Sequence, residues 1–478
     1  MSDLFEGLAP LAPLRFFAKI SAIPRPSSHE GAIADYIEAF AAARSLWCYR
    51  DAANNVLIKK SASPDRVDAP AVLLQAHTDM VAEKNEGTTH DFLTDGLKLR
   101  RQGDLLFAEG TTLGADDGFG VAVMLAVLDD ASLSHPPLEC LFTTEEEIGM
   151  GGAELFDYSL ISAQYMLNLD SAEENTVIVG CCGGLRSKAT LPVARIPLQG
   201  TGLRVSLGGL CGGHSGEDIH RGRGNALSLL GRVLTALRKE QSFRLAEIHG
   251  GDKTNAIPRE CTALLMGEDM AAIEKALPAI FAEERKCLKA PEDAEAALIL
   301  TPAPVESLMS EADTARVLSF LALKSGVLRM REQPPIMPAV SRNLANVRTT
   351  GEAVTFGLSS RANDIVARDA AGEEIAMLAA SLGGDCVHYN PYQGWEEPFH
   401  GKLVADWQQA YRSVTGKETM PTLIHAGLET GVITAAVEGL SAIAVGCNIH
   451  DLHTPRERME LSSFLRIYQT VLAFLRII

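Results

Sequence analysis

Short apolar segments that end in a carboxylate or an imidazole constrain the fold of this chain more than any other feature. The segment 71–76 reads AVLLQA and leads into His77 and Asp79, and the segment 165–169 reads YMLNL and leads into Asp170. Nearly continuous apolar segments of this length are typical of strands that are covered on both faces of a sheet. In open α/β sheets, sites form at the carboxyl ends of the strands. The sequence therefore predicts a sheet with chemically active residues along one edge.

Two styles of secondary structure alternate along the chain. Up to about residue 190, strands and helices alternate, which is the pattern of an α/β fold. Alternating strands interleaved with amphipathic helices follow, and they favour an α+β arrangement with a largely antiparallel sheet. The first style returns at the end of the chain. We therefore predict a discontinuous catalytic domain of the α/β class, formed by residues 1–191 and 393–478, with an α+β domain inserted at 192–392.

The individual elements are expected from the spacing of apolar residues. We expect strands over residues 56–58, 71–76, 138–142, 165–169, 203–207, 261–266, 354–359 and 440–445. We expect helices over residues 3–17, 30–43, 118–128, 226–239, 271–286, 312–323, 365–381, 403–415 and 462–478.

Composition excludes several classes of function. Of the 478 residues, 46% are hydrophobic and 22% are charged, which is ordinary for a globular protein and favours two domains at this length. A net charge of -18 argues against binding to nucleic acid or to an anionic membrane. The sequence lacks the pattern of a signal peptide and of a membrane helix. The nine cysteines are scattered, which indicates free thiols and a cytoplasmic protein.

Five residues at the ends of apolar segments are candidate metal ligands: His77, Asp116, Glu147, Asp170 and His453. Imidazole and carboxylate ligands without cysteine suit two neighbouring Zn²⁺-like ions, and one carboxylate can bridge the pair. Two members have alternatives. Asp116 starts a helix and could be an ordinary N-cap, and His450 competes with His453 for the last imidazole position. Taken together, the five positions indicate metal-assisted hydrolysis.

Three consecutive glutamates, residues 145–147, follow the strand expected at 138–142. Their carboxylates would repel one another at a strand end, and bound cations remove that repulsion. We expect Glu147 to be a ligand and Glu146 to act as general base toward a metal-bound water. Asp79 lies two residues after His77, and we expect it to fix the tautomer and the orientation of that imidazole.

Seven motifs run in the order in which they occur in a known family. They are LLQAHTDMV (73–81), GTTLGADDGFG (110–120), TTEEEIGMGGA (143–153), GLCGGHSGEDIHRGRGNA (209–226), NAIPRE (255–260), IHAGLETG (424–431) and HTP (453–455). The motifs extend over nearly the whole chain. On this basis the sequence resembles the co-catalytic zinc metallopeptidases, a family that includes carnosinases, carboxypeptidase G and peptidase T.

The resemblance implies a function and a cofactor. It implies the same five ligands with Asp116 as the bridge, Glu146 as general base and Asp79 as the partner of His77. Two divalent ions are implied, most simply zinc, with manganese or cobalt able to substitute. The implied reaction is hydrolysis of unblocked dipeptides with broad specificity, the Xaa-His type included. The inserted domain is implied to be a lid, and the assembly a homodimer.

Four further positions are candidates for binding the peptide substrate. The resemblance implies that His214, in GGHSG, reaches the scissile carbonyl and that Arg361 holds the substrate's carboxylate. Without the resemblance, His214 reads as part of a glycine turn and Arg361 as a surface ion pair. Asn255 could donate a hydrogen bond to substrate or cap a turn. His425 could line the substrate pocket or support the metal ligands. Glu429, a fifth position, has the same two alternatives.

Two other functions fit part of the same pattern. A deacylase of N-acyl amino acids would use the same metal site, so only its substrates would distinguish it. A non-catalytic metal-binding protein would be expected to lack a ligand or the general base, and both are present in this sequence.

Overall fold

The computed structural model describes residues 4–478 and divides into two compact units. Unit 1 comprises the chain up to Cys181, Trp395–Leu423 and Leu428–Ile478, and unit 2 comprises Cys182–Gly394 and Ile424–Gly427. Unit 2 is therefore inserted into a discontinuous unit 1. The sequence placed the first crossing near residue 192, whereas β9 (Gly183–Pro192) pairs with two strands of unit 2. Its ten residues consequently belong to the insertion.

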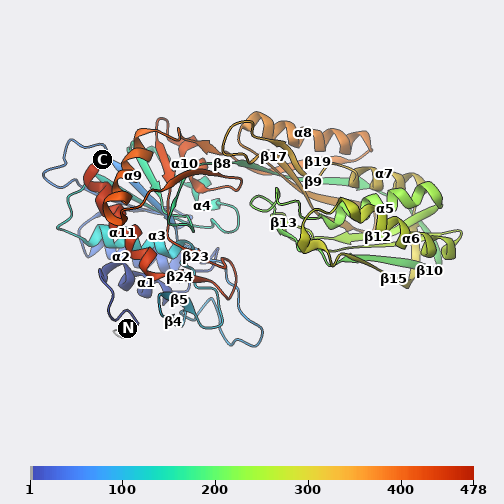
Figure 1. The fold of residues 1–478 in the computed structure, drawn as a ribbon, viewed down its shortest axis with the longest axis horizontal. Coiled ribbons are helices and arrows are strands. Elements are labelled where there is room, and N and C mark those ends of the chain that lie inside the picture. Colours follow the sequence, from blue (N-terminus) through green and yellow to red (C-terminus); the bar gives the residue numbers. More distant parts are fainter. Residues whose placement is uncertain (1–3) are drawn as a thin grey trace. The chain divides into compact units, whose positions relative to one another are not determined.

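Unit 1 is built on a twisted sheet whose central strands are parallel (Figure 1). The strand order is β1 (Trp47–Arg50), β2 (Val56–Lys60), β6 (Leu138–Thr143), β3 (Val72–His77), β7 (Tyr165–Asn168), β22 (Ser441–Ala444), β8 (Thr176–Cys181) and β20 (Trp395–Glu396), with β21 (Met420–Ile424) beside β8. Strands β6, β3, β7 and β22 run parallel, whereas the outer pairs are antiparallel. Strands β3 and β6 are buried along their whole length, which explains why most of their residues are apolar.

The helices of unit 1 cover this sheet. They are α1 (Ala12–Ser21), α2 (Gly31–Ala42), α3 (Ala115–Asp129), α4 (Gly151–Leu155), α9 (Lys402–Thr415), α10 (Glu429–Ala436) and α11 (Leu461–Ile477). The ring of Phe464 on α11 contacts Phe17 of α1 and Phe119 of α3 edge to face, at centroid distances of 6.2 and 5.0 Å. These contacts join the first and last helices of the unit, so its core depends on both ends of the chain.

The first helix was expected over residues 3–17 and instead begins at Ala12. Residue 3 lies outside the described part of the chain. Pro10 cannot donate a backbone hydrogen bond and disfavours helical geometry in the residue before it, so a helix through this position is interrupted. Pro13 is tolerated because it lies in the first turn of α1, where its missing N–H would have no partner within the helix.

A small antiparallel sheet lies at the edge of unit 1. Its strand order is β23 (Ile449–His450), β24 (Arg458–Glu460), β5 (Leu105–Ala108) and β4 (Leu99–Gln102). Strand β24 pairs with β5, so a hairpin near the end of the chain lies beside a segment from its first quarter. This sheet fixes the position of the segments next to β5 relative to the turn between β23 and β24.

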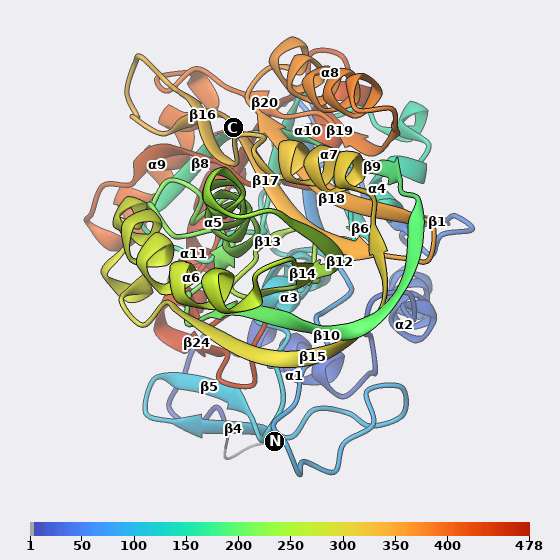
Figure 2. The ribbon, with the colours of Figure 1, turned by 90° about the vertical axis from the view of Figure 1, so that its right-hand side faces the viewer.

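Unit 2 is an α+β sandwich with an antiparallel sheet. The strand order is β15 (Ala297–Met309), β10 (Arg195–Gly208), β14 (Cys261–Gly267), β12 (Phe243–Gly250), β17 (Pro338–Thr349), β18 (Ala353–Ala362), β9 and β19 (Asp385–Tyr392), with β16 (Gly326–Met330) beside β17. Helices α5 (Ala226–Glu240), α6 (Met270–Glu284), α7 (Glu311–Leu321) and α8 (Ile365–Ser381) share one apolar core with the sheet. Helices α5 and α6 contact β10, and α7 contacts β12 (Figure 2).

Among residues 4–478, no helix is both long and apolar enough to cross a membrane.

Candidate metal centre

Three of the candidate ligands lie at the carboxyl ends of adjacent parallel strands in unit 1. His77 is the last residue of β3, Glu147 lies in the turn after β6, and Asp170 follows β7. His77 is level with the end of β6 in the strand register, and the end of β7 is level with Gln75. Because the ends of these strands are aligned at one edge, side chains that are distant in sequence converge there.

The other two ligands reach this edge from the small sheet. His453 lies in the turn between β23 and β24, and Asp116 lies at the start of α3, after β5. His453 has a φ of 60° and Asp451 a φ of 53°, both in the left-handed region that side chains other than glycine rarely adopt. Strain of this kind is concentrated at functional sites, where the surrounding structure enforces it. The turn is therefore shaped to present the imidazole.

The carboxylate of Asp116 faces both imidazoles. Its Oδ1 lies 3.0 Å from Nε2 of His77, and its Oδ2 lies 3.2 Å from Nε2 of His453. His453 Nε2 is also 3.1 Å from Glu147 Oε2, and His77 Nε2 is 4.0 Å from Asp170 Oδ1. The ligand atoms thus form two groups, His77–Asp116–Asp170 and Asp116–Glu147–His453. Asp116 belongs to both groups, as a bridging carboxylate would.

The spacing and the chemistry of these atoms fit divalent metal ions. Two ligands at 2.0–2.1 Å from a tetrahedral Zn²⁺ lie about 3.3 Å apart. The distances from Asp116 to the two imidazoles, 3.0 and 3.2 Å, are close to that separation. A third group of atoms comes from His77, Glu146 and Glu147, so Glu146 is adjacent to the same centre. The donors are imidazole nitrogens and carboxylate oxygens, which suit zinc and manganese.

The pKa values of the cluster also fit a site for cations. Burial and the charge of Asp116 raise the pKa of Asp170 well above its usual range. Burial lowers the pKa of His77 and of His453, but hydrogen bonds and charges of the surrounding carboxylates, with Asp116 first among them, together outweigh it, and the pKa of His453 rises to about 11. Without a cation, the excess of carboxylates is balanced by protons on carboxyl and imidazole groups. Metal ions would displace those protons.

Asp79 organises the residues around His77. Its Oδ1 lies 3.3 Å from Nδ1 of His77, which leaves Nε2 of the imidazole toward Asp116. The same carboxylate accepts hydrogen bonds from the backbone N–H of Glu146 at 3.1 Å and of Glu147 at 3.2 Å, and from the hydroxyl of Ser27 at 2.8 Å. Asp79 is completely buried. One carboxylate therefore orients an imidazole and fixes the turn that carries two glutamates.

The geometry bears on the alternative interpretations of two candidate ligands, Asp116 and His453. The N-cap position of α3 is Gly114, and no side chain caps the helix from there. Asp116 has non-helical backbone angles, and the neighbouring Asp117 accepts the N–H of Gly120 at 2.9 Å. Asp117 thus performs the capping that Asp116 was suspected of. His450 Nε2 lies 2.9 Å from Glu460 Oε1, and His450 is outside the ligand groups found in residues 4–478.

The four candidate substrate residues all lie in unit 2. His214 is in β11 (Gly213–His214), which pairs with β13 (Ala256–Ile257), and Asn255 accepts the N–H of Ser215 at 2.8 Å through its carbonyl. Asn255 and His214 are therefore neighbours.

Arg361 and His425 form a second pair in unit 2. Arg361 of β18 is opposite Ser341 of β17, and the hydroxyl of Ser341 lies 2.7 Å from His425 Nε2. Arg361 is buried and donates to the hydroxyl of Tyr392 at 2.8 Å. Burial lowers the pKa of His425 to about 3, and the charge of Arg361 acts in the same direction. His425 is consequently neutral at physiological pH.

These pairs belong to one neighbourhood. The backbone carbonyl of His425 touches the space where a Cβ of Gly216 would lie, and Gly216 also approaches the ring of His214. A glycine is required at this position because any side chain would collide with that carbonyl. The GGHSG motif, expected from its sequence to be either a turn or a functional loop, is a tight turn packed against the HAG segment.

The sequence pointed to Glu429 as a residue that could support the metal ligands, but not to the polar network around it. The side-chain amide of Gln75 donates to Glu429 at 2.6 Å, and the hydroxyl of Thr143 donates to the same carboxylate at 2.6 Å. Asn168 donates to Gln75 at 2.6 Å. These polar residues interrupt the apolar runs of β3, β6 and β7. A polar residue inside a strand that is buried on both faces was the available signal, because such a group needs a buried partner.

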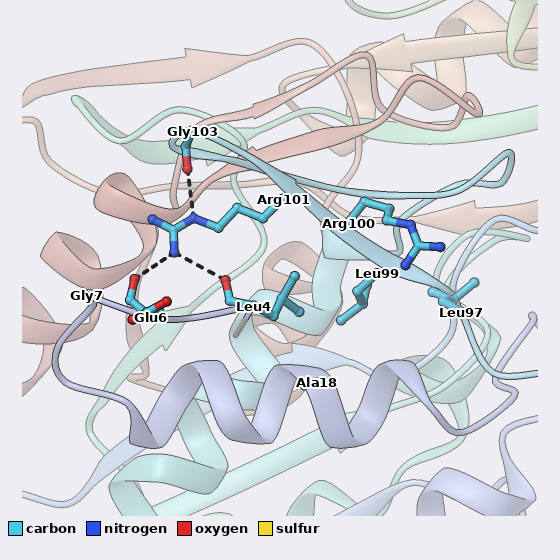
Figure 3. Close-up of a pocket in the computed structure, with 9 residues that line it drawn as sticks. All are labelled: Leu4, Glu6, Gly7, Ala18, Leu97, Leu99, Arg100, Arg101 and Gly103. Atoms are coloured by element: carbon cyan, nitrogen blue, oxygen red, sulfur yellow. Dashed lines mark hydrogen bonds between the residues drawn. The ribbon is translucent and has the colours of Figure 1, made fainter. Parts of the chain in front are cut away.

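A hollow of about 910 Å³ lies elsewhere in unit 1, beside α1 and the β4–β5 hairpin (Figure 3). Its most prominent cation, Arg101, already donates to the backbone carbonyls of Gly103, Leu4 and Glu6. Arg100 is paired with Glu109 at 2.6 Å. None of the candidate metal ligands lines this hollow.

Comparisons with known proteins agree with this geometry. Residues 205–284 match the peptidase dimerisation domain of the M20 type. The chain is 33% identical over 468 residues to the cytosol non-specific dipeptidase of Escherichia coli K12, a match that covers 97% of this chain and 96% of the relative.

Solved structures give the same result. The aminoacylhistidine dipeptidase of Vibrio alginolyticus matches with a TM-score of 0.83, 33% identity and 99% coverage of both chains. Aminopeptidase PepT of Bacillus cereus, at 14% identity, 97% coverage of both chains and a TM-score of 0.57, shares the fold. The resemblance found in the sequence motifs is thereby confirmed, and the chain belongs to the M20 family of metallopeptidases.

Proposed function

We propose that this protein is a cytoplasmic metallodipeptidase that hydrolyses unblocked dipeptides with broad specificity, the Xaa-His type included. The observation that carries the proposal is the carboxylate of Asp116, whose two oxygens face the imidazoles of His77 and His453. Dipeptides are supported as the substrate class because the chain belongs to the M20 family and is 33% identical to a relative named as a dipeptidase.

Two divalent ions, most simply zinc, would be held by the two ligand groups that share Asp116. His77 and Asp170 would complete one group, and Glu147 and His453 the other. When bound, such ions make water a nucleophile near neutral pH and stabilise negative charge on a carbonyl oxygen. Manganese or cobalt could replace zinc in this ligand set.

Glu146 is assigned as the general base. It takes a proton from the attacking water as the C–O bond forms, and it returns the proton to the leaving amine as the C–N bond breaks. Its backbone N–H is held by Asp79, which also orients His77, so the base and the ligand keep a fixed relation. Holding a catalytic group in a fixed geometry lowers the barrier because its orientation is set before the reaction.

The residues of unit 2 are assigned to the substrate. His214 is proposed to donate to the scissile carbonyl, and Arg361 to bind the carboxylate of the dipeptide. Asn255 and His425 are proposed to complete this binding surface, and the neutral state of His425 suits a hydrogen-bonding role rather than an ionic one. The dimerisation-domain match supports a homodimer.

Hydrolysis of a small panel of compounds tests the proposal. The panel contains β-Ala-His, Gly-Gly and an N-acetyl amino acid, each with metal-free protein and with added Zn²⁺ or Mn²⁺. The expected result is metal-dependent cleavage of both unblocked dipeptides. Cleavage of only the acetylated compound would replace this proposal with a deacylase, and inactivity despite two bound metal ions would indicate a non-catalytic metal-binding protein.

A further inference from the structure

The turn that precedes Asp116 is held by a carboxylate from the end of the chain. Glu457 is 2% exposed, and it accepts the backbone N–H groups of Leu113 and Gly114 through Oε2, at 2.8 and 3.0 Å. Its Oε1 accepts the N–H of Ala115 at 2.8 Å. Three successive N–H groups around one buried carboxylate form an anion-binding concavity. Glu457 follows His453 closely, so the hairpin that carries one ligand is attached to the turn that carries another.

A carbonyl of the same turn accepts a hydrogen bond from a buried cation. Arg25 is 1% exposed, and its Nη2 donates to the carbonyl of Gly114 at 2.5 Å. Its Nη1 donates to the carbonyls of Thr78 and Asp79, at 2.9 and 3.0 Å. A planar guanidinium can join two backbone segments in this way because its donors have a fixed geometry. Arg25 thus connects the end of β3, just after His77, to the turn before Asp116.

Glu457 and Arg25 therefore bind the same turn, one through its N–H groups and the other through a carbonyl. The carboxylate takes the N–H groups of residues 113–115, and the guanidinium takes the carbonyl of Gly114. Since the two side chains have opposite charges, they fix the turn without adding net charge to the ligand cluster. Three ligand-bearing segments become linked: the end of β3, the start of α3 and the β23–β24 hairpin.

We propose that Arg25 and Glu457 are positioning residues that set the separation of His77, Asp116 and His453, and thereby the metal affinity of the centre. This inference rests on the proposed function, because it assumes that these three residues bind metal ions. Groups that hold metal ligands in place typically change metal affinity by about 10–100-fold when they are replaced.

Two substitutions separate this role from general stabilisation. In Glu457→Gln the side chain keeps one acceptor oxygen, so at least one of the three N–H groups loses its partner and the negative charge is removed. In Arg25→Lys the positive charge remains, but a single ammonium group cannot donate to the end of β3 and to Gly114 in the geometry of a guanidinium. Arg25→Met removes both the charge and the donors. If that variant does not fold, Arg25→Lys still tests the role of the guanidinium.

Glu139→Gln is a matched control within the same unit. Glu139 is 3% exposed and accepts the backbone N–H groups of Ser162 and Ala163 at 3.0 and 3.1 Å. It is therefore a buried carboxylate with two backbone partners, as Glu457 is with three. It lies near the amino end of β6, away from the ligand edge. Its replacement should lower stability without changing metal affinity.

The measurement is the affinity of metal-free protein for Zn²⁺, by competition with a chromophoric chelator, alongside the thermal midpoint of each metal-free variant. We expect Glu457→Gln and Arg25→Lys to bind Zn²⁺ about 10–100-fold more weakly, and Glu139→Gln to remain within about twofold of the parent protein. Parental affinity in both variants, or equal weakening in the control, would overturn the inference. If the parent protein itself failed to bind Zn²⁺, the proposed function would fail instead.

Discussion

Replacing Glu429 with Gln is predicted to stabilise the metal-free protein above pH 7 and to have little effect near pH 4. Glu429 is completely buried, and one of its oxygens accepts hydrogen bonds from Gln75 and Thr143, both at 2.6 Å. Burial raises the pKa of this carboxyl to about 7, although the charge of His77 and these two hydrogen bonds act against the increase. A carboxyl in the unfolded chain titrates at about 4.3.

The sign and the size of the effect follow from this difference in pKa. Between about pH 4.5 and 7 the unfolded chain has lost the proton that the folded protein still holds, so the free energy of unfolding falls by about 1.4 kcal/mol per pH unit. The loss is complete above pH 7 and amounts to about 3.7 kcal/mol. Gln resembles the protonated carboxyl, because its oxygen accepts the same two hydrogen bonds and it does not titrate.

The assay is thermal unfolding of the metal-free protein at several pH values. A change of about 1 kcal/mol moves the midpoint of a unit of this size by about 2 °C, so the midpoint of Glu429→Gln should exceed that of the parent by about 7 °C at pH 8. At pH 5 the gap should be less than about a third of that value. The exposed Glu438→Gln serves as the control for removing a surface carboxylate. A gap that is equal at both pH values, or a less stable variant at pH 8, would refute the reasoning.

Three further outcomes are expected. Glu146→Ala should retain its metal ions by elemental analysis and lose about 10²–10⁴-fold in kcat, and unchanged turnover would remove Glu146 from the general-base role. His453→Ala should bind fewer Zn²⁺ ions per chain than the parent, whereas His450→Ala should bind the same number, because His450 pairs with Glu460 outside the ligand groups. Phe356→Ala should lower the free energy of unfolding by about 3–5 kcal/mol, measured by denaturant titration, since this buried ring stacks on another in the core of unit 2 at a centroid distance of 4.2 Å.

The central sheet and its active edge could be predicted from the sequence. Strands β3, β6 and β7 are mostly apolar because both of their faces are covered, and their expected limits differ from the observed ones by a residue or so. Polar residues placed directly after such strands had to collect at one edge. Candidate ligands that directly follow such strands, such as His77 and Asp170, could therefore be recognised without knowledge of the packing.

The supporting contacts could not be predicted, because they join segments that have no local pattern. Glu457 lies 342 residues from Ala115, and nothing in the sequence HTPRE distinguishes its glutamate from a solvated one. The short strands β23 and β24 contain two and three residues, too few to show an alternating pattern. Similarly, which of Asp116 and Asp117 caps α3 depends on backbone angles that the sequence does not specify.

Titration of the metal-free protein with Zn²⁺, with hydrolysis of an unblocked dipeptide followed at each addition, tests the central claim most directly. The account predicts that the metal-free protein is inactive and that activity rises until two equivalents of Zn²⁺ are bound per chain. Hydrolysis by the metal-free protein, or full activity with a single bound ion, would contradict a centre in which Asp116 bridges two metal ions.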